Sequence, residues 1–207
     1  MSQCIRELTL NLGDCTGTGS VYKRIAARGI IRRDDKYLAI YSKYGDYKFP
    51  GGGREAGEEL EDTLLRELQE ETGCRIIPES IGDYLLVHER RKGNPEDWLE
   101  MDSWYFFCDI EETVYERSLD DYEKEYGYQV VWMTLEEMIR RNEAGDREKT
   151  PWIVREAMVM RELTGLGAVV SLSYGACSPH NGRQDPEEIL GIIRAVGAEH
   201  CIMMTDY

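Results

Sequence analysis

The stretch that decides the fold is GGGREAGEELEDTLLRELQEETGC, residues 51–74, in which three glycines precede a run of acidic side chains. After the glycines the apolar residues follow a helical period, because Leu60, Leu64 and Leu68 recur every four positions and form one stripe. Gly73 stands where a residue in the left-handed conformation would end such a helix. The stretch therefore predicts a glycine loop followed by an amphipathic helix.

The predicted helix, residues 59–72, carries acids at offsets that bring side chains together. Glu67, Glu70 and Glu71 lie three or four residues apart, so their carboxylates project from one face. Each such pair repels by roughly 0.2–0.5 kcal/mol. Mg²⁺ is a hard cation that takes oxygen ligands and shares the phosphate oxygens of a substrate. The acids therefore indicate a site for a divalent cation, and Arg66 is placed to offset their repulsion.

The fixed residues of this stretch form a long, specific motif. In order they are Gly52, five residues, Glu58, seven residues, then Arg66, Glu67, Leu68, one residue, Glu70, Glu71, one residue, Gly73 and Cys74. This pattern resembles the signature of the Nudix hydrolases, G-x5-E-x7-R-E-U-x-E-E-x-G-U with U apolar. Only the last position departs from usage, because Cys stands where Ile, Leu or Val is commoner, and Cys behaves as a small hydrophobe.

The resemblance implies a fold, a reaction and a set of site residues. The expected fold is α/β, an α/β/α sandwich with a mixed sheet. The expected activity is that of a pyrophosphohydrolase, in which water attacks a phosphoanhydride of a nucleoside diphosphate linked to a moiety X. The substrate would be a nucleoside triphosphate, a nucleotide sugar or ADP-ribose, and the cofactor Mg²⁺, with Mn²⁺ as the alternative. The implied catalytic residues are Glu70, Glu67, Arg66 and Glu58, and the implied metal ligands are Gly52, Glu67, Glu70 and Glu71.

Two other interpretations of the acidic run stay open. The acids could form a solvated helix face, which is the usual fate of a charge run. Alternatively, the chain could be a Nudix-fold sensor that binds a nucleotide without hydrolysing it. Loss of catalysis usually erodes the signature glutamates, and none is lost here.

The substrate-binding residues are less clearly marked. Tyr47 and Phe49 are candidates for stacking on a base, with core packing as the alternative. Arg90 and Arg91 precede Lys92 in a basic cluster that could grip phosphates, with a solvated turn as the alternative. The proline expected downstream of the signature in ADP-ribose pyrophosphatases is not found. The substrate is therefore left open.

A further acid is expected near the segment DDYEKEYGYQVVW, which is similar to the segment before the last strand in many family members. There an acid assists with the metal or acts as a base. Glu123 and Glu125 are the candidates, and the sequence does not choose between them.

The composition limits the range of partners. The net charge is −15, from 25 basic and 40 acidic side chains, which disfavours charge-driven binding to nucleic acid or to an anionic membrane. No window approaches 18 apolar residues, and the start lacks a secretory signal, so a cytoplasmic protein is expected. The expected partner is a small-molecule nucleotide, and a homodimer is a further expectation.

The periodicity divides the chain into three parts. Residues 1–20 are interpreted as a leader or a short extra strand, residues 21–163 as the Nudix domain, and residues 164–207 as a small C-terminal β-α-β appendage for packing or assembly. Alternating segments predict strands within RIAARGIIR, KYLAIYSK, DYLLVHERRK, SWYFFCDI and YQVVWMT. Two further helices are predicted after the capping residues Thr134 and Thr150, the second with Pro151 as its first residue.

Overall fold

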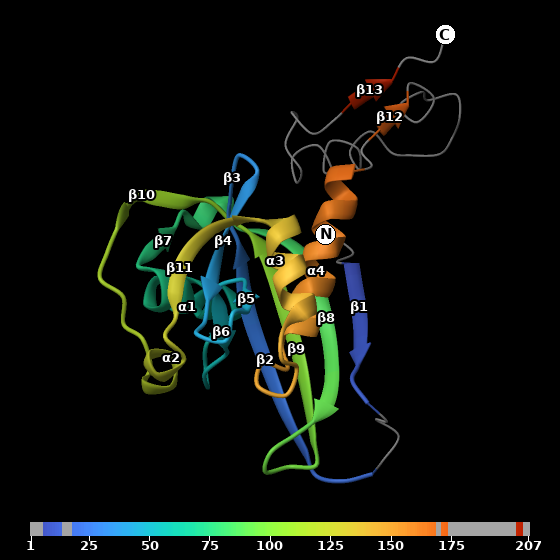
Figure 1. Cartoon of the computed structure of the whole chain (residues 1–207). Coiled ribbons are helices and arrows are strands. Elements are labelled where there is room, and N and C mark those ends of the chain that lie inside the picture. The colour runs from blue at the N-terminus through green and yellow to red at the C-terminus, as the bar shows by residue number, and fades with distance from the viewer. Residues whose placement is uncertain (1–5, 14–17, 169–170, 174–201, 205–207) are drawn as a thin grey trace. The chain divides into compact units, whose positions relative to one another are not determined.

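The computed structural model describes residues 6–13, 18–168, 171–173 and 202–204 (Figure 1). Residues 1–158 form one compact unit and residues 159–207 another. The helices are α1 (Leu60–Thr72), α2 (Asp121–Tyr126), α3 (Leu135–Ala144) and α4 (Ile153–Ala168), with a 3-10 turn over Pro78–Ser80. The strands are β1 (Arg6–Asn11), β2 (Val21–Ile30), β3 (Arg32–Arg33), β4 (Lys36–Tyr41), β5 (Tyr47–Lys48), β6 (Gly51–Gly53), β7 (Cys74–Ile76), β8 (Gly82–Lys92), β9 (Trp98–Phe107), β10 (Ile110–Val114), β11 (Gln129–Thr134), β12 (Ser171–Ser173) and β13 (Ile202–Met204).

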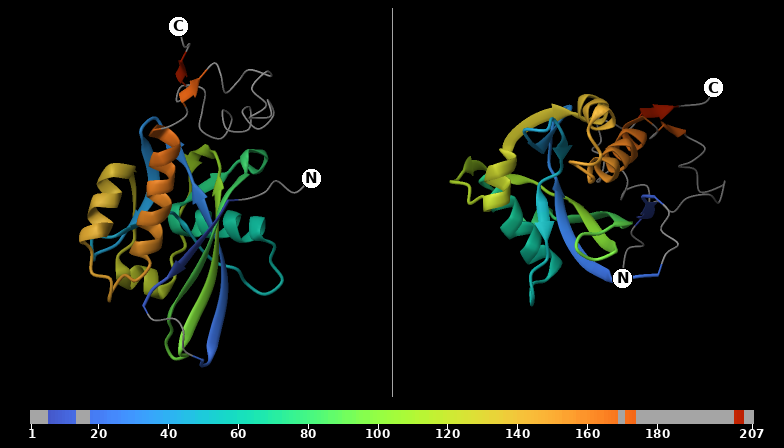
Figure 2. Two further views of the ribbon diagram at one scale, coloured as in Figure 1. Left: turned by 90° about the vertical axis from the view of Figure 1, so that its right-hand side faces the viewer. Right: turned by 60° about the horizontal axis from the view of Figure 1, so that its bottom comes forward.

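The first unit is built on mixed sheets. One sheet has the strand order β1-β8-β9-β2-β6, in which β1 pairs with β8 and β2 with β9 in parallel, and the other pairs are antiparallel. A second sheet has the order β11-β4-β3, with β5 also paired to β4. The views in Figures 1 and 2 place α1 and α3 on opposite sides of these strands. The expected mixed α/β architecture is confirmed.

The leucine stripe of α1 forms the core of this unit as predicted. Leu64 and Leu68 are fully buried and pack in a cluster with Ala27, Leu38 and Phe106 from the strands. Burying a leucine side chain contributes about 1.5–3 kcal/mol, so this face of α1 holds the helix on the sheet. The opposite face is left to carry the acids.

The ends of α1 also follow the sequence. Gly73 adopts φ 75°, the left-handed conformation expected of a residue that ends a helix, and its N–H donates to the Gln69 carbonyl. At the other end the Asp62 carboxylate accepts a hydrogen bond from the Glu59 N–H at 3.2 Å. Asp62 is thereby used in capping the helix and does not pair with Arg66.

Some elements differ from the predictions. The N-terminal segment contains a strand, β1, which is the second of the two alternatives given for residues 1–20. The helix predicted from Pro151 begins at Ile153. It continues through Gly165 and Gly167 to Ala168, so these two glycines do not end it. In the appendage β12 and β13 pair in parallel, as expected of a β-α-β unit. The helix predicted between them lies outside the described residues.

Helix α2 was not predicted, although the sequence carries its signals. Asp120 and Glu123 have the spacing of a capping box, and the structure contains both of its hydrogen bonds. Gly127 follows with φ 67° and ends the helix. The helix has only six residues, too few to show a 3.6-residue period, which explains why a search for periodicity misses it.

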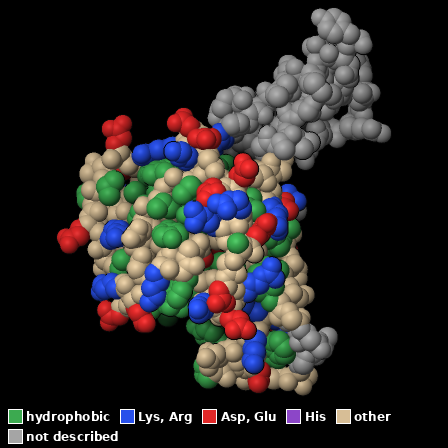
Figure 3. Space-filling model, in the orientation of Figure 1, with side chains coloured by type: hydrophobic (Ala, Val, Ile, Leu, Met, Phe, Trp, Pro, Cys, Tyr) green, Lys and Arg blue, Asp and Glu red, His purple; other side chains and the backbone are tan. Residues whose placement is uncertain are grey.

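Charges of both signs alternate on the face of the molecule in Figure 3, where Lys and Arg lie among Asp and Glu. Among the residues coloured by type in Figure 3, that face has no large patch of a single charge sign. Within the described residues, none of the helices has both the length and the hydropathy needed to cross a membrane.

Candidate functional site

The glycine loop is shaped by close contacts with the backbone and with α1. Gly51 has φ 135°, and a Cβ there would lie 2.1 Å from the Ala27 carbonyl oxygen of β2. A Cβ on Gly52 would lie 2.3 Å from Oε2 of Glu67. Only glycine fits at position 51, where the clash is with backbone, whereas a side chain at position 52 would displace the Glu67 carboxylate. The loop and α1 are therefore built as one unit.

Arg66 is the central cation of the signature. Its Nε and Nη2 donate to the two oxygens of Glu58 at 2.6 and 3.0 Å. Its Nη1 donates to Glu67 at 2.8 Å and to Glu70 at 3.2 Å. Arg66 hydrogen bonds lower the pKa of Glu58 to about 2. One guanidinium thus orients three predicted catalytic acids and offsets the repulsion expected along α1.

Glu71 is held by a different cation. Its Oε1 accepts a hydrogen bond from Lys48 Nζ at 2.7 Å, and its Oε2 accepts one from the Gly51 N–H at 2.8 Å. The Glu71 side chain is only 1% exposed. Lys48 was not singled out from the sequence, because one lysine before a Phe-Pro-Gly turn carries no recognisable signal.

Two further carboxylates respond to the charge of Glu71. Burial, and then repulsion by Glu71, raise the pKa of Glu67 despite its bond to Arg66. The same two causes raise the pKa of Glu123 to about 7. Carboxyl groups with raised pKa values beside like charges are typical of catalytic sites, where a base must accept a proton near neutral pH.

The two acids of α2 that the sequence left open differ in their surroundings. Glu123 is buried, with its carboxylate bonded to the Asp120 N–H and the Tyr122 hydroxyl, both at 2.9 Å. Glu125 is exposed and contributes its backbone carbonyl to a bond with Lys43. Glu123 is the acid within electrostatic reach of the signature.

Helices α3 and α4 fix the segment that enters the glycine loop. The Asn142 amide exchanges two hydrogen bonds with the Tyr47 backbone, both at 2.8 Å. Glu156 accepts a hydrogen bond from the Phe49 N–H at 3.1 Å. Arg28 donates to the Gly51 carbonyl at 3.0 Å from the facing strand. These supporting side chains were missed by the sequence analysis because nothing local marks them.

A buried ionic network stands behind these contacts. Arg155 donates to Glu89 at 2.6 Å and to Glu156 at 2.9 Å, and its Nε donates to the Tyr105 hydroxyl at 3.0 Å. All three charged side chains are at most 1% exposed. The network connects β8 and β9 to the entrance of the glycine loop through Glu156.

The predicted substrate-binding residues lie elsewhere or are buried. Phe49 is fully buried and meets Tyr105 edge-on, and Tyr47 is 4% exposed, so neither offers a ring face to a base. For these two, the alternative of core packing is what the structure shows. Arg90 pairs with Glu100 at 3.2 Å and Arg91 with Glu89 at 2.9 Å. The structure places both in ion pairs of the β8–β9 sheet and not among the signature acids.

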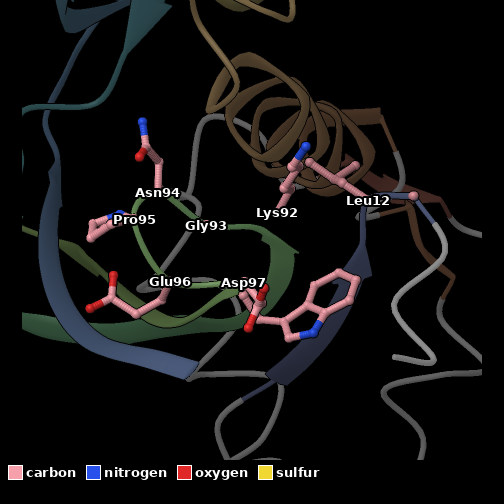
Figure 4. A pocket seen from close by; sticks show the side chains of 9 residues that line it. Leu12, Lys92, Gly93, Asn94, Pro95, Glu96 and Asp97 are labelled. Atoms are coloured by element: carbon pink, nitrogen blue, oxygen red, sulfur yellow. The ribbon is translucent and has the colours of Figure 1, made fainter. Parts of the chain in front are cut away.

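Two hollows are lined by described residues. One, of about 720 Å³, lies at the tip of the β8–β9 hairpin, with Leu12 and Lys92 on one side and Asn94 and Pro95 on the other (Figure 4). The other, of about 500 Å³, is lined by residues that include Tyr115, Arg117 and Trp132. The lining of neither hollow includes a glutamate of the signature.

The predicted metal ligands do not form a ready-made cage. Over the described ranges, residues 6–13, 18–168, 171–173 and 202–204, no three His, Cys, Asp or Glu side chains are grouped closely enough to hold an ion as they stand. Instead Glu67 and Glu70 share Arg66, and Glu71 is bonded to Lys48. The chemistry of the donors nonetheless fits a hard divalent cation, because the carboxylates of Glu67 and Glu123 are raised in pKa by the neighbouring charge of Glu71 as well as by burial.

Comparisons with known proteins agree with this geometry. A family model described as the NUDIX domain matches residues 23–153. An ADP-ribose pyrophosphatase of Methanocaldococcus jannaschii is 40% identical over 62 residues, which are 28% of this chain and 36% of that protein. An uncharacterised Nudix hydrolase of Bacillus subtilis is 32% identical over 72 residues, 34% of this chain and 46% of that protein. The matches thus span less than half the length of either relative.

Solved structures give a further comparison. A MutT NUDIX hydrolase from Burkholderia pseudomallei is 20% identical with a TM-score of 0.45, covering 56% of this chain and 85% of that one. A NUDIX hydrolase from Nitrosomonas europaea is 20% identical with a TM-score of 0.46, covering 67% of this chain and 90% of that one.

Proposed function

The chain belongs to the Nudix hydrolase family, and from that premise we propose that it hydrolyses a phosphoanhydride of a nucleoside diphosphate linked to a moiety X. The observation that carries the proposal is the intact signature, in which Arg66 joins three of its glutamates and the fourth, Glu71, lies beside the glycine loop. A solvated charge run would not bury Glu71 or raise the pKa of Glu67 and Glu123.

The proposal includes a divalent cation, Mg²⁺ or Mn²⁺. Glu67 and Glu70 would hold it, with the Gly52 carbonyl and the neighbouring Glu71 and Glu123 as further oxygen donors. A bound cation would neutralise phosphoryl charge and lower the pKa of the attacking water. Its double positive charge would also relieve the repulsion that raises the pKa values of Glu67 and Glu123.

The chain's own residues account for the remaining steps. The oxygen of water forms a bond to phosphorus, the bridging P–O bond breaks, and the leaving phosphate takes the electron pair. A buried carboxylate accepts the proton from water, and Glu67 and Glu123 are the candidates because their pKa values are raised. Arg66 keeps Glu58, Glu67 and Glu70 in fixed relative positions, which holds the acids ready before the substrate arrives.

ADP-ribose is the first substrate to try. The support is the relative named as an ADP-ribose pyrophosphatase, which shares 40% identity over 62 residues. The proline expected downstream of the signature in ADP-ribose pyrophosphatases is missing, which favours a different substrate. Other nucleoside diphosphate compounds should therefore be tested beside ADP-ribose.

The experiment that tests the function is chromatographic analysis of the nucleotide products after incubation with Mg²⁺ and a panel of nucleotides, because cleavage of these compounds yields mononucleotides, sugar phosphates or pyrophosphate. The panel contains ADP-ribose, nucleoside and deoxynucleoside triphosphates, nucleotide sugars and dinucleoside polyphosphates. We expect turnover of at least one compound, abolished by a chelator. Stabilisation against heat by a nucleotide, with no product from any compound, would contradict hydrolysis and favour a nucleotide sensor.

The two acids of α2 are expected to behave differently once a substrate is known. Glu123→Gln should lower kcat by about 10²- to 10⁴-fold, because it removes a buried carboxylate that can accept a proton or an ion. Glu125→Gln, two residues along the same helix, should leave kcat unchanged because that side chain is exposed. Steady-state kinetics of both variants checks this, and equal effects would remove Glu123 from the site.

A further inference from the structure

Lys48 lies in an unusual place for a lysine. Its side chain is 9% exposed, and its ammonium lies 2.7 Å from Glu71 Oε1 and 4.4 Å from the centre of the Tyr128 ring. Burial by itself would lower the pKa of this lysine, but the Glu71 carboxylate and the neighbouring Tyr128 together outweigh it and the pKa is raised. Lys48 is therefore a fixed positive charge inside the acidic site.

The backbone contacts of the residues on either side of Lys48 direct its side chain toward α1. The backbones of its two neighbours are bonded to the helices, Tyr47 through Asn142 and Phe49 through Glu156. Since side chains alternate along an extended segment, holding Tyr47 and Phe49 in this way turns the residue between them toward α1. The Tyr128 ring then packs over the ammonium.

The charge of Lys48 acts on several acids of the site. It opposes in part the rise in the pKa values of Glu67 and Glu123 that burial and the Glu71 charge cause. The cation of the signature, Arg66, donates its hydrogen bonds to the carboxylates of Glu58, Glu67 and Glu70. Lys48 is the cation bonded to Glu71 among the described residues.

We propose that Lys48 is an internal counter-ion that occupies the cation position on Glu71 and so weakens the binding of a divalent cation by the acidic site. This inference rests on the metal dependence included in the proposed function. The Lys48 ammonium and a divalent cation would share the same carboxylates, so the charge of each would weaken the binding of the other. The resident ammonium therefore keeps the metal exchangeable, so that the cation is held firmly only when the phosphates of a substrate add their negative charge.

The test measures Mn²⁺ binding by calorimetry in the absence of any nucleotide. Lys48→Met removes the charge with little change in length, and we expect the Kd for Mn²⁺ to fall roughly tenfold or more. Lys48→Arg keeps the charge, and Lys149→Met removes a charge from an exposed site. The Kd of each of these variants for Mn²⁺ should therefore stay within about threefold of the value for the unchanged protein. Mn²⁺ should also raise the Tm of Lys48→Met by more than that of the unchanged protein.

The outcomes separate this inference from the function on which it rests. If the unchanged protein binds Mn²⁺ and Lys48→Met binds it with an equal or higher Kd, the counter-ion role is overturned. The proposed hydrolase activity is not affected by that result. The absence of Mn²⁺ binding in every variant would overturn both proposals. If Lys48→Met does not fold, Lys48→Gln replaces it, because the amide is neutral and still offers Glu71 a hydrogen bond.

Discussion

Replacing Glu70 by glutamine is expected to lower kcat by about 10²- to 10⁴-fold while leaving the Tm within about 2 °C of the unchanged protein. Glu70 is the most exposed acid of the signature cluster, with 40% of its side chain accessible, and its bond to Arg66 is the longest of that set at 3.2 Å. Gln keeps the shape and loses the charge. Activity should therefore fall without loss of the fold.

The comparison with Glu71→Gln makes this prediction sharper. Glu71 is also expected to be needed for turnover, but it is buried and bonded to Lys48 and to the Gly51 N–H. Its replacement leaves a buried lysine unpaired, a change that typically destabilises by about 3–5 kcal/mol. Glu71→Gln should thus lower both kcat and the free energy of unfolding, whereas Glu70→Gln lowers kcat alone. Kinetics and thermal unfolding of the pair measure the difference.

A different pattern would contradict the assignments. Full activity in Glu70→Gln would remove the carboxylate of Glu70 from the metal site. A Glu71→Gln protein as stable as the unchanged one would mean that the pair with Lys48 contributes nothing to the fold. Circular dichroism at the assay temperature confirms that each variant is folded when its activity is measured.

The parts of the site that the sequence predicts are those whose spacing is local. Arg66 and Glu70 lie four residues apart on one helix, and Glu67 and Glu70 lie three apart, so the helical offsets predict that these side chains are neighbours. Gly52 and Glu58 enter through a motif of fixed length. The apolar stripe predicts which face of α1 is buried, because the same period that gathers the leucines separates them from the acids.

The parts that the sequence does not predict depend on long-range pairing. Lys48 and Glu71 are 23 residues apart, and Phe49 and Glu156 are 107 residues apart, so no local pattern connects them. Phe49 illustrates the error this causes, because an aromatic residue beside a glycine loop is equally compatible with stacking on a base and with filling the core. The fold decides for the core by packing Phe49 against Tyr105.

A second large effect on stability is expected from Arg155→Met. Arg155 is 1% exposed and is bonded to Glu89, Glu156 and the Tyr105 hydroxyl. Without it two buried carboxylates lose their main partner, and breaking such a pair typically destabilises by about 3–5 kcal/mol. For a unit of this size we expect the Tm to fall by roughly 10 °C. Thermal unfolding followed by circular dichroism measures the change.

The mechanism behind this loss can be separated from a simple packing defect. Adding Glu156→Gln to Arg155→Met removes one of the stranded charges and keeps an acceptor for the Phe49 N–H, so the double variant should regain part of the lost Tm. Arg140→Gln removes an arginine from an exposed pair with Glu137 and should leave the Tm unchanged. Because Glu156 also fixes the entrance of the glycine loop, Arg155→Met should lower kcat even at temperatures where it is fully folded. A double variant less stable than Arg155→Met would show that the unpaired charges are not the cause, and that lost packing is.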